Sequence, residues 1–211
     1  MKKVIISVDG PAGSGKGRIA KYISLKWKFQ HLDSGLIYRE LAYLLIKSKI
    51  DINSKDQIKK IINKNNSITY KKSNVLRTEK ISKIASKIAV HKFVRDYINK
   101  IQRNFVNSSK KNKCFVIDGR DIGSVVFKNA NLKLYIDVSE KIRAKRRYKQ
   151  LIDTGEKSIY RQILKDIKLR DKKDIQRTNS PLLIPNGAVI IDNSGSFRNT
   201  TNQINNLIKN L

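Results

Sequence analysis

The stretch VDGPAGSGKGR, residues 8–18, decides the fold class of this chain. It matches the pattern G-x-x-x-x-G-K-[ST] at Gly10, Gly15 and Lys16, but Gly17 stands where the pattern has a hydroxyl side chain. Glycines permit the backbone dihedrals that turn amide groups toward phosphate oxygens, and a following helix adds the free amides of its first turn. We therefore predict a phosphate-binding loop made of Gly10, Pro11, Ala12, Gly13, Ser14, Gly15, Lys16, Gly17 and Arg18.

The segments on either side of the loop have the periodicity that such a loop requires. Residues 2–9, KKVIISVD, form a short apolar run rich in Val and Ile, which is typical of a buried strand. After the loop, apolar side chains recur at helical spacings, at Ile19, Tyr22, Ile23 and Trp27. A strand before the glycines and a helix after them is the context in which this motif binds phosphate.

The rest of the chain alternates predicted strands with predicted helices. Further strands are expected at residues 29–33, 114–118, 132–138 and 188–192. Helices are expected at 34–48, 55–63, 77–106 with a break before 92, 139–153 and 160–177, and at the end of the chain; a short extended piece is expected at 67–70. This alternation predicts an α/β protein, a three-layer fold around a central five-stranded parallel sheet, with residues 1–211 as one domain.

Composition narrows the classes of protein and of partner. Lys and Arg number 46 against 17 Asp and Glu, a formal net charge of +29, which attracts polyanions of any kind. The lysines are spread along the whole chain, which favours a solvated basic surface over a dedicated nucleic-acid arm. Cys114 is the only cysteine, so it can form neither an intramolecular disulfide nor a thiolate metal cluster. No stretch approaches the ~20 apolar residues of a membrane span, and we expect a soluble cytoplasmic protein with no membrane partner.

Three further stretches, LDSGLIYR (32–39), IDGRDIGSVVF (117–127) and RDKKDIQR (170–177), resemble the bacterial cytidylate kinase family when taken with GPAGSGKG and RAKRR. The resemblance runs in order over nearly the whole chain. It implies phosphate-loop nucleoside monophosphate kinase activity, the transfer of the γ-phosphoryl group of ATP to CMP or dCMP. It also implies ATP as cosubstrate, Mg²⁺ as cofactor, a nucleotide-binding insertion at about 51–80 and a lid at about 146–160. We separately expect a monomer.

The resemblance assigns ten positions to the binding of the nucleotide substrate. A carboxylate that accepts from the N4 amino group suits cytosine and repels uracil, and Asp121 stands at the position that does this. Positions near the base are Ser86 and Arg95; those for the monophosphate are Ser34, Tyr38, Arg39, Arg120 and Arg177; those near the sugar are Arg170 and Asp174. Two alternatives stay open, that Asp121 caps a loop or pairs with Arg120, and that Arg170 and Asp174 are a surface ion pair.

The resemblance also assigns the chemistry of phosphoryl transfer. Lys16 is the mobile cation of the loop, and Arg143, Arg146 and Arg147, spaced three and four apart on one helix face, belong to the lid that closes on ATP. The alternative for these arginines is a solvated basic face. Asp118 ends a strand and could orient hydrated Mg²⁺, with Asp33 as a weaker candidate, so the catalytic set is Lys16, Arg143, Arg147 and Asp118 without direct metal ligands. His31 and His91 are expected to be incidental.

The chain departs from the family pattern in two places. Gly17 fits the G-K-G-T ending of nucleoside monophosphate kinases, but Arg18 replaces the hydroxyl residue that follows it, which leaves the magnesium arrangement open. The segment between about 63 and 77 is short for this family. Rival functions are another small-molecule phosphate-loop kinase, of the uridylate or shikimate type, and a nucleic-acid-binding protein that kept the fold.

Overall fold

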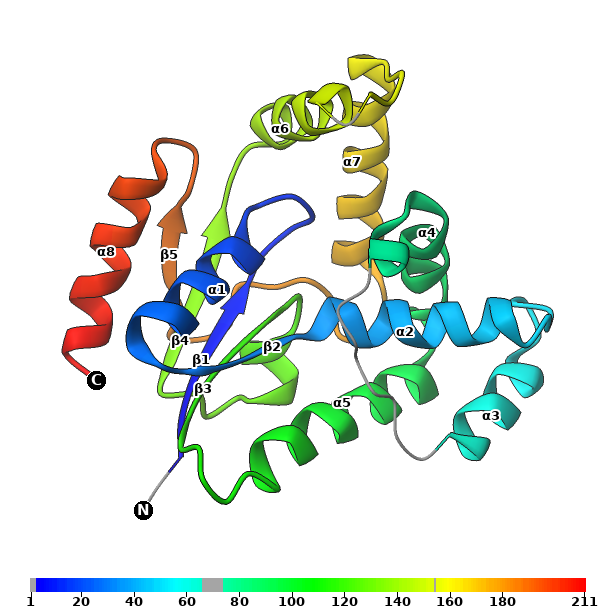
Figure 1. The fold of residues 1–211 in the computed structure, drawn as a ribbon, viewed down its shortest axis with the longest axis horizontal. Helices are drawn as coiled ribbons and strands as arrows, with labels where there is room; N and C mark the ends of the chain where they lie inside the picture. The colour runs from blue at the N-terminus through cyan, green and yellow to red at the C-terminus, as the bar shows by residue number, and fades with distance from the viewer. Residues whose placement is uncertain (1–2, 66–73, 154) are drawn as a thin grey trace. The chain divides into compact units, whose positions relative to one another are not determined.

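The computed structural model describes residues 3–65, 74–153 and 155–211. The chain forms two compact units (Figure 1). We call the first, residues 1–32 and 112–211, the phosphate-loop unit, and the second, residues 33–111, the helical unit. The predicted boundaries of the insertion at 51–80 and of the lid at 146–160 stay predictions.

The chain contains a five-stranded sheet in the order β2-β3-β1-β4-β5. The strands are β1 (Val4–Asp9), β2 (Gln30–Asp33), β3 (Cys114–Gly119), β4 (Leu132–Asp137) and β5 (Val189–Asp192). β1 pairs in parallel with β3 and β4, and β4 pairs in parallel with β5. The register places Asp9 opposite both Gly119 and Tyr135, so the loops that leave β1 and β3 begin side by side at the carboxyl edge. The predicted parallel sheet and its five strands are confirmed.

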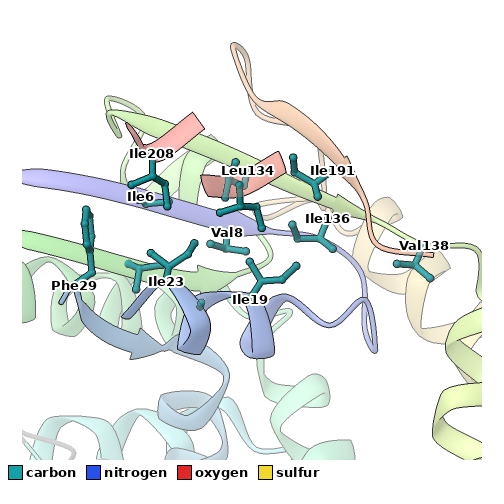
Figure 2. Close-up of a cluster of buried hydrophobic side chains, with 13 residues drawn as sticks. Ile6, Val8, Ile19, Ile23, Phe29, Leu134, Ile136, Val138, Ile191 and Ile208 are labelled. Atoms are coloured by element: carbon teal, nitrogen blue, oxygen red, sulfur yellow. The ribbon is translucent and has the colours of Figure 1, made fainter. Parts of the chain in front are cut away.

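Aliphatic side chains bury one face of the sheet under two helices (Figure 2). Helix α1 (Lys16–Trp27) contributes Ile19 and Ile23, and helix α8 (Phe197–Lys209) contributes Ile204 and Ile208. They meet strand residues whose side chains point to that face, which are Ile6, Val8, Val116, Leu134, Ile136 and Ile191. Burying each such side chain stabilises the fold by about 1.5–3 kcal/mol, so this core holds the start of α1 firmly against β1.

Two more helices and one irregular turn complete the phosphate-loop unit. Helix α6 (Glu140–Asp153) packs against helix α7 (Tyr160–Gln176). After β3 the backbone forms a π-helical turn, η2 (Ile122–Val126), which packs against β1. Sequence periodicity did not predict this turn, because five residues are too few to show a period, and such turns often accompany functional sites.

The helical unit contains α2 (Ser34–Lys47), α3 (Lys55–Lys64), the 3₁₀ turn η1 (Asn74–Arg77), α4 (Glu79–Ile88) and α5 (Lys92–Asn107). α2 packs against α4, and α3 packs against α5. The predicted break before residue 92 is confirmed, with Ala89 as the C-cap of α4 and His91 as the N-cap of α5. The expected extended piece at 67–70 lies outside the described residues. Within the described ranges, no helix has the length and apolarity that a membrane crossing requires.

Candidate functional site

The loop between β1 and α1 has the backbone geometry of an anion cradle. Its glycines adopt positive φ angles, 150° at Gly10, 76° at Gly13 and 88° at Gly15. A Cβ at Gly10 would lie 2.6 Å from the carbonyl oxygen of Ile136, so the loop tolerates no side chain there. Gly15 occupies the N-cap position of α1 and has no side chain with which to cap it. The first amides of the helix are therefore left for a ligand.

Side-chain donors hold the carbonyl groups of this loop from other elements. The pairs are Arg120 Nη1 with Gly10 O at 3.0 Å, Arg143 Nη1 with Ala12 O at 2.9 Å, and Asn193 Nδ2 with Ser14 O at 2.8 Å. Lys16 Nζ donates to Pro11 O at 3.1 Å. Because these donors fix the carbonyl groups, the amide groups of the loop keep the orientation that anion binding needs.

Arg143 is a buried brace rather than a member of a solvated basic face. Its side chain is 3% exposed, and its Nε donates to Val138 O at 2.9 Å. Its Nη2 donates to Asp171 Oδ2 at 2.5 Å, and that carboxylate is 8% exposed. With the bond to Ala12, all three guanidinium nitrogens are engaged within the phosphate-loop unit. Sequence reasoning gave no role to Asp171, although it lies in the stretch RDKKDIQR beside Arg170.

The other two predicted lid arginines lie nearer the solvent on α6. Arg146 is exposed, and its Nη2 donates to Asn193 O at 2.7 Å. Arg147 is half-buried, and its Nη1 donates to Gln150 Oε1 at 3.1 Å. Asn193 thus contacts both the phosphate loop and helix α6, and Thr200 Oγ1 donates to its Oδ1 at 2.9 Å. Asn193 follows β5 directly, which is the only sequence signal that could have pointed to it.

Three of the predicted substrate residues meet in one cluster. Asp174 Oδ2 accepts from Arg120 Nε at 2.9 Å, and its Oδ1 accepts from Arg177 Nη1 at 3.1 Å. Burial opposes ionisation of Asp174, but the charges of Arg120 and Arg177 outweigh it and lower the pKa of the carboxyl. The alternative of a simple surface pair between Arg170 and Asp174 is wrong, since Asp174 is buried and its hydrogen bonds go to the other two arginines.

Asp121 stands at the start of the π-helical turn. It is 4% exposed, and its carbonyl oxygen accepts from Val125 N at 2.9 Å and from Val126 N at 3.2 Å. The next two amides, of Ile122 and Gly123, donate to the carboxylate of Asp9, each at 2.7 Å. Burial raises the pKa of Asp9 to about 7, although both of these amides favour its ionised form. Sequence reasoning treated Asp9 only as the end of a strand.

Asp118 lies beside the start of α1. Its Oδ2 is 3.5 Å from the position that a Cβ of Gly17 would take. Its Oδ1 is 2.7 Å from His31 Nε2, a contact that the sequence did not predict. Asp33, the weaker metal candidate, is the N-cap of α2 and accepts from Leu36 N at 3.2 Å. Among the residues that the structure describes, there is no cluster of three or more His, Cys, Asp or Glu that could ligate a metal directly.

Arg18 extends from the first turn of α1 onto the ring of Phe197. Its Cζ is 3.8 Å from the ring centroid, and the side chain is exposed. Phe197 also meets Tyr22 edge-on, with ring centroids 5.9 Å apart. The guanidinium therefore stacks on α8 of the same unit.

The helical unit gathers the remaining predicted substrate residues on α2, α4 and α5. Arg95 is 3% exposed, donates to Ala89 O at 3.0 Å and has its Cζ 5.8 Å from the centroid of the Tyr38 ring. A Cβ at Gly35 would lie 3.4 Å from Nη1 of Arg39, so the glycine lets that guanidinium lie over the start of α2. The other two predicted residues are Ser34, buried at the start of α2, and Ser86, half-buried on α4.

A parallel α/β sheet with a glycine-rich loop between β1 and α1, and with arginines fixed around that loop, defines a phosphate-loop phosphotransferase. The profile of the family described as cytidylate kinase matches residues 6–210, and the chain belongs to this family. The cytidylate kinase of Rickettsia akari is 40% identical over 210 residues, which cover 99% of this chain and 93% of the relative. That of Rickettsia felis is 40% identical over 209 residues, with 97% and 91% covered.

A solved structure of an uncharacterized protein from Eubacterium ventriosum covers 100% of both chains with a TM-score of 0.55. Its sequence identity is 16%, so this likeness shows the fold alone. The family that the sequence motifs predicted is confirmed.

Proposed function

We propose that the protein transfers the γ-phosphoryl group of ATP to the phosphate of CMP and dCMP. One observation carries the proposal: the phosphate loop and the loop of Arg120 and Asp121 leave adjacent strands, and Arg120 bonds to the phosphate loop itself at Gly10 O. The segment proposed to bind the donor phosphates and the segment proposed to bind the cytosine nucleotide are therefore neighbours within one unit. Membership of the cytidylate kinase family supports the same reaction.

The donor side is the phosphate loop and its cations. The amides between Gly10 and Gly17 suit the inner phosphates, and Lys16 can swing from Pro11 O to the outer ones. Arg143 acts by holding the loop, since its nitrogens already have protein partners. Arg146 and Arg147 lie nearer the solvent on α6, and we propose that they neutralise the negative charge of the phosphoryl group during transfer.

The acceptor side reads cytosine and binds its phosphate. A buried carboxylate at Asp121 accepts from the exocyclic amino group of cytosine and would face the carbonyl oxygen of uracil unfavourably. Arg120 and Arg177 supply forked donors for the phosphate, and Asp174 holds both in place. The further proposed contacts of the CMP nucleotide are Arg170 and, from the helical unit, Ser34, Tyr38, Arg39, Ser86 and Arg95.

The chemical step needs positioning and charge more than an enzyme nucleophile. An oxygen of the CMP phosphate attacks the γ-phosphorus of ATP in line, the bond from that phosphorus to the β-phosphate oxygen breaks, and CDP and ADP result. The cations around the loop stabilise the charge that spreads over the transferred oxygens.

Mg²⁺ fits the residues present only as a hydrated ion. Asp118 is a buried carboxylate beside Gly17, and Gly17 offers no hydroxyl ligand, so water would complete the coordination, as Mg²⁺ readily allows. When bound, the ion neutralises charge on the phosphates of ATP. His31 fixes the orientation of Asp118. We further propose a monomer that acts in the cytoplasm.

A substrate panel tests the proposal. ADP release is measured with ATP and Mg²⁺ across CMP, dCMP, UMP, AMP, dTMP and shikimate. We expect CMP and dCMP to be turned over well and UMP poorly. Equal or better turnover of any other acceptor would refute the specificity, and salt-steep RNA binding that survives Lys16→Ala, with no turnover, would point to a nucleic-acid-binding protein instead.

A further inference from the structure

The carboxylate of Asp9 is the one acidic group at the carboxyl edge of β1, and the reaction as described does not use it. It is 0% exposed and stands immediately before the phosphate loop. Burying a charged group without a function is costly, so a carboxylate retained at this point calls for an explanation. Its contacts supply one.

Both oxygens of Asp9 hold the backbone that follows Asp121. Oδ1 accepts from the amide of Ile122 and Oδ2 from the amide of Gly123, each at 2.7 Å. These are the first two residues of the π-helical turn, whose leading amides have no partner within the turn itself. Asp9 therefore caps this turn from another strand through two buried hydrogen bonds.

The neighbouring residues are shaped to keep this approach close. A Cβ at Gly123 would lie 2.6 Å from Ser7 Oγ and 3.2 Å from Asp9 Oδ2. Only a glycine lets the turn come this near to β1. Arg120, on the other side of Asp121, donates back to Gly10 O at 3.0 Å. Hydrogen bonds therefore hold the chain on both sides of Asp121, from Arg120 to Gly10 before it and from Ile122 and Gly123 to Asp9 after it.

We propose that Asp9 is a positioning residue for nucleotide specificity, which fixes the carboxylate of Asp121 relative to the phosphate loop and so couples recognition of the acceptor base to the site of the donor phosphates. This inference rests on the proposed function. Asparagine at position 9 would offer an oxygen to one amide and turn its own NH₂ group toward the other. One hydrogen bond to the turn is then replaced by a repulsive contact, and the turn moves away from β1.

The experiment compares the wild-type protein with Asp9→Asn in steady-state assays with CMP, UMP and ATP. For Asp9→Asn we expect KM for CMP to rise about tenfold and the ratio of kcat/KM for CMP to that for UMP to fall about tenfold, which is the size of one buried hydrogen bond. KM for ATP should stay within about twofold, because the amides and carbonyl partners of the phosphate loop are unchanged.

Ser7→Ala is the matched control. Ser7 is also 0% exposed and next to Gly123, but its hydroxyl has no hydrogen-bond partner among the described residues. This variant should match the wild type in both KM values and in the CMP-to-UMP ratio. A folded Asp9→Asn protein whose CMP-to-UMP ratio is also that of the wild type would overturn the positioning role.

A second perturbation covers the case in which Asp9→Asn does not fold. Gly123→Ala pushes the turn away from β1 and should also raise KM for CMP selectively. Adding Ser7→Ala to it removes the nearest clashing atom and should restore part of the loss. Equal rises in the KM values for CMP and ATP, or no restoration, would refute the inference. Wild-type protein that fails to phosphorylate CMP would instead refute the proposed function, and the inference with it.

Discussion

Replacing Arg143 by methionine tests whether this arginine is a structural brace. The substitution leaves the carboxylate of Asp171 buried, at 8% exposure, without its 2.5 Å partner. It also removes the donors to Ala12 O and Val138 O. Breaking one side of a buried ion pair costs about 3–5 kcal/mol, because the remaining charge is desolvated without compensation. We therefore expect the free energy of unfolding to fall by about that amount.

Unfolding in urea, followed by tryptophan fluorescence, measures this loss. Trp27 is the only tryptophan of the chain, and it packs against the core of the phosphate-loop unit, so the signal reports that unit. Lys145→Met is the matched control, since Lys145 is an exposed cation on the same helix, and its loss should change stability by less than about 0.5 kcal/mol.

A double variant separates stability from activity. Arg143→Met with Asp171→Leu should recover most of the stability, because an apolar pair of similar volume often replaces a buried ion pair without loss. We expect KM for ATP to rise in Arg143→Met and to stay raised in the double variant, since Ala12 O lacks the donor that Arg143 supplied in both. If Arg143→Met unfolds at the same urea concentration as the wild type and Lys145→Met, the brace argument is wrong.

Three further outcomes are expected. Asp121→Ala should lower the preference for CMP over UMP by at least about tenfold and change KM for ATP little, and unchanged CMP turnover would contradict its base-reading role. Arg18→Ala should cost about 0.5–1 kcal/mol of stability, because it loses the contact with Phe197 at 3.8 Å, while KM for ATP stays the same; a large rise in that KM would show a phosphate contact instead. Burial raises the pKa of Asp9 from 3.8 to about 7, so the contribution of Asp9 to stability is full below about pH 4 and is lost as the pH rises through 7. The difference in free energy of unfolding between wild type and Asp9→Asn, measured by denaturation, should therefore shrink by as much as about 4 kcal/mol over that range. A difference that does not depend on pH would contradict the raised pKa.

Local sequence was enough to predict the strands and the α-helices of this fold, but not its two short helical turns η1 and η2. The Val- and Ile-rich run of residues 4–9, the glycines at 10, 13 and 15 and the helical spacing after Lys16 are each properties of a few neighbouring residues. The same holds for the other strands, because the period of two or of 3.6 is visible within a single segment. The family motifs could be located in the same way, since each is a contiguous stretch.

Only the tertiary structure decided which of these side chains act on one another. Asn193 reaches Ser14 across 179 residues of sequence, Asp9 reaches Ile122 across 113, and His31 reaches Asp118 across 87. No local pattern specifies such pairs, because they follow from the strand order β2-β3-β1-β4-β5, which brings the carboxyl ends of distant strands to one edge. The phosphate loop could therefore be predicted from the sequence alone. The side-chain donors that hold its carbonyl groups, and the carboxylate of Asp9 that holds the backbone after Asp121, come together only once the sheet has formed.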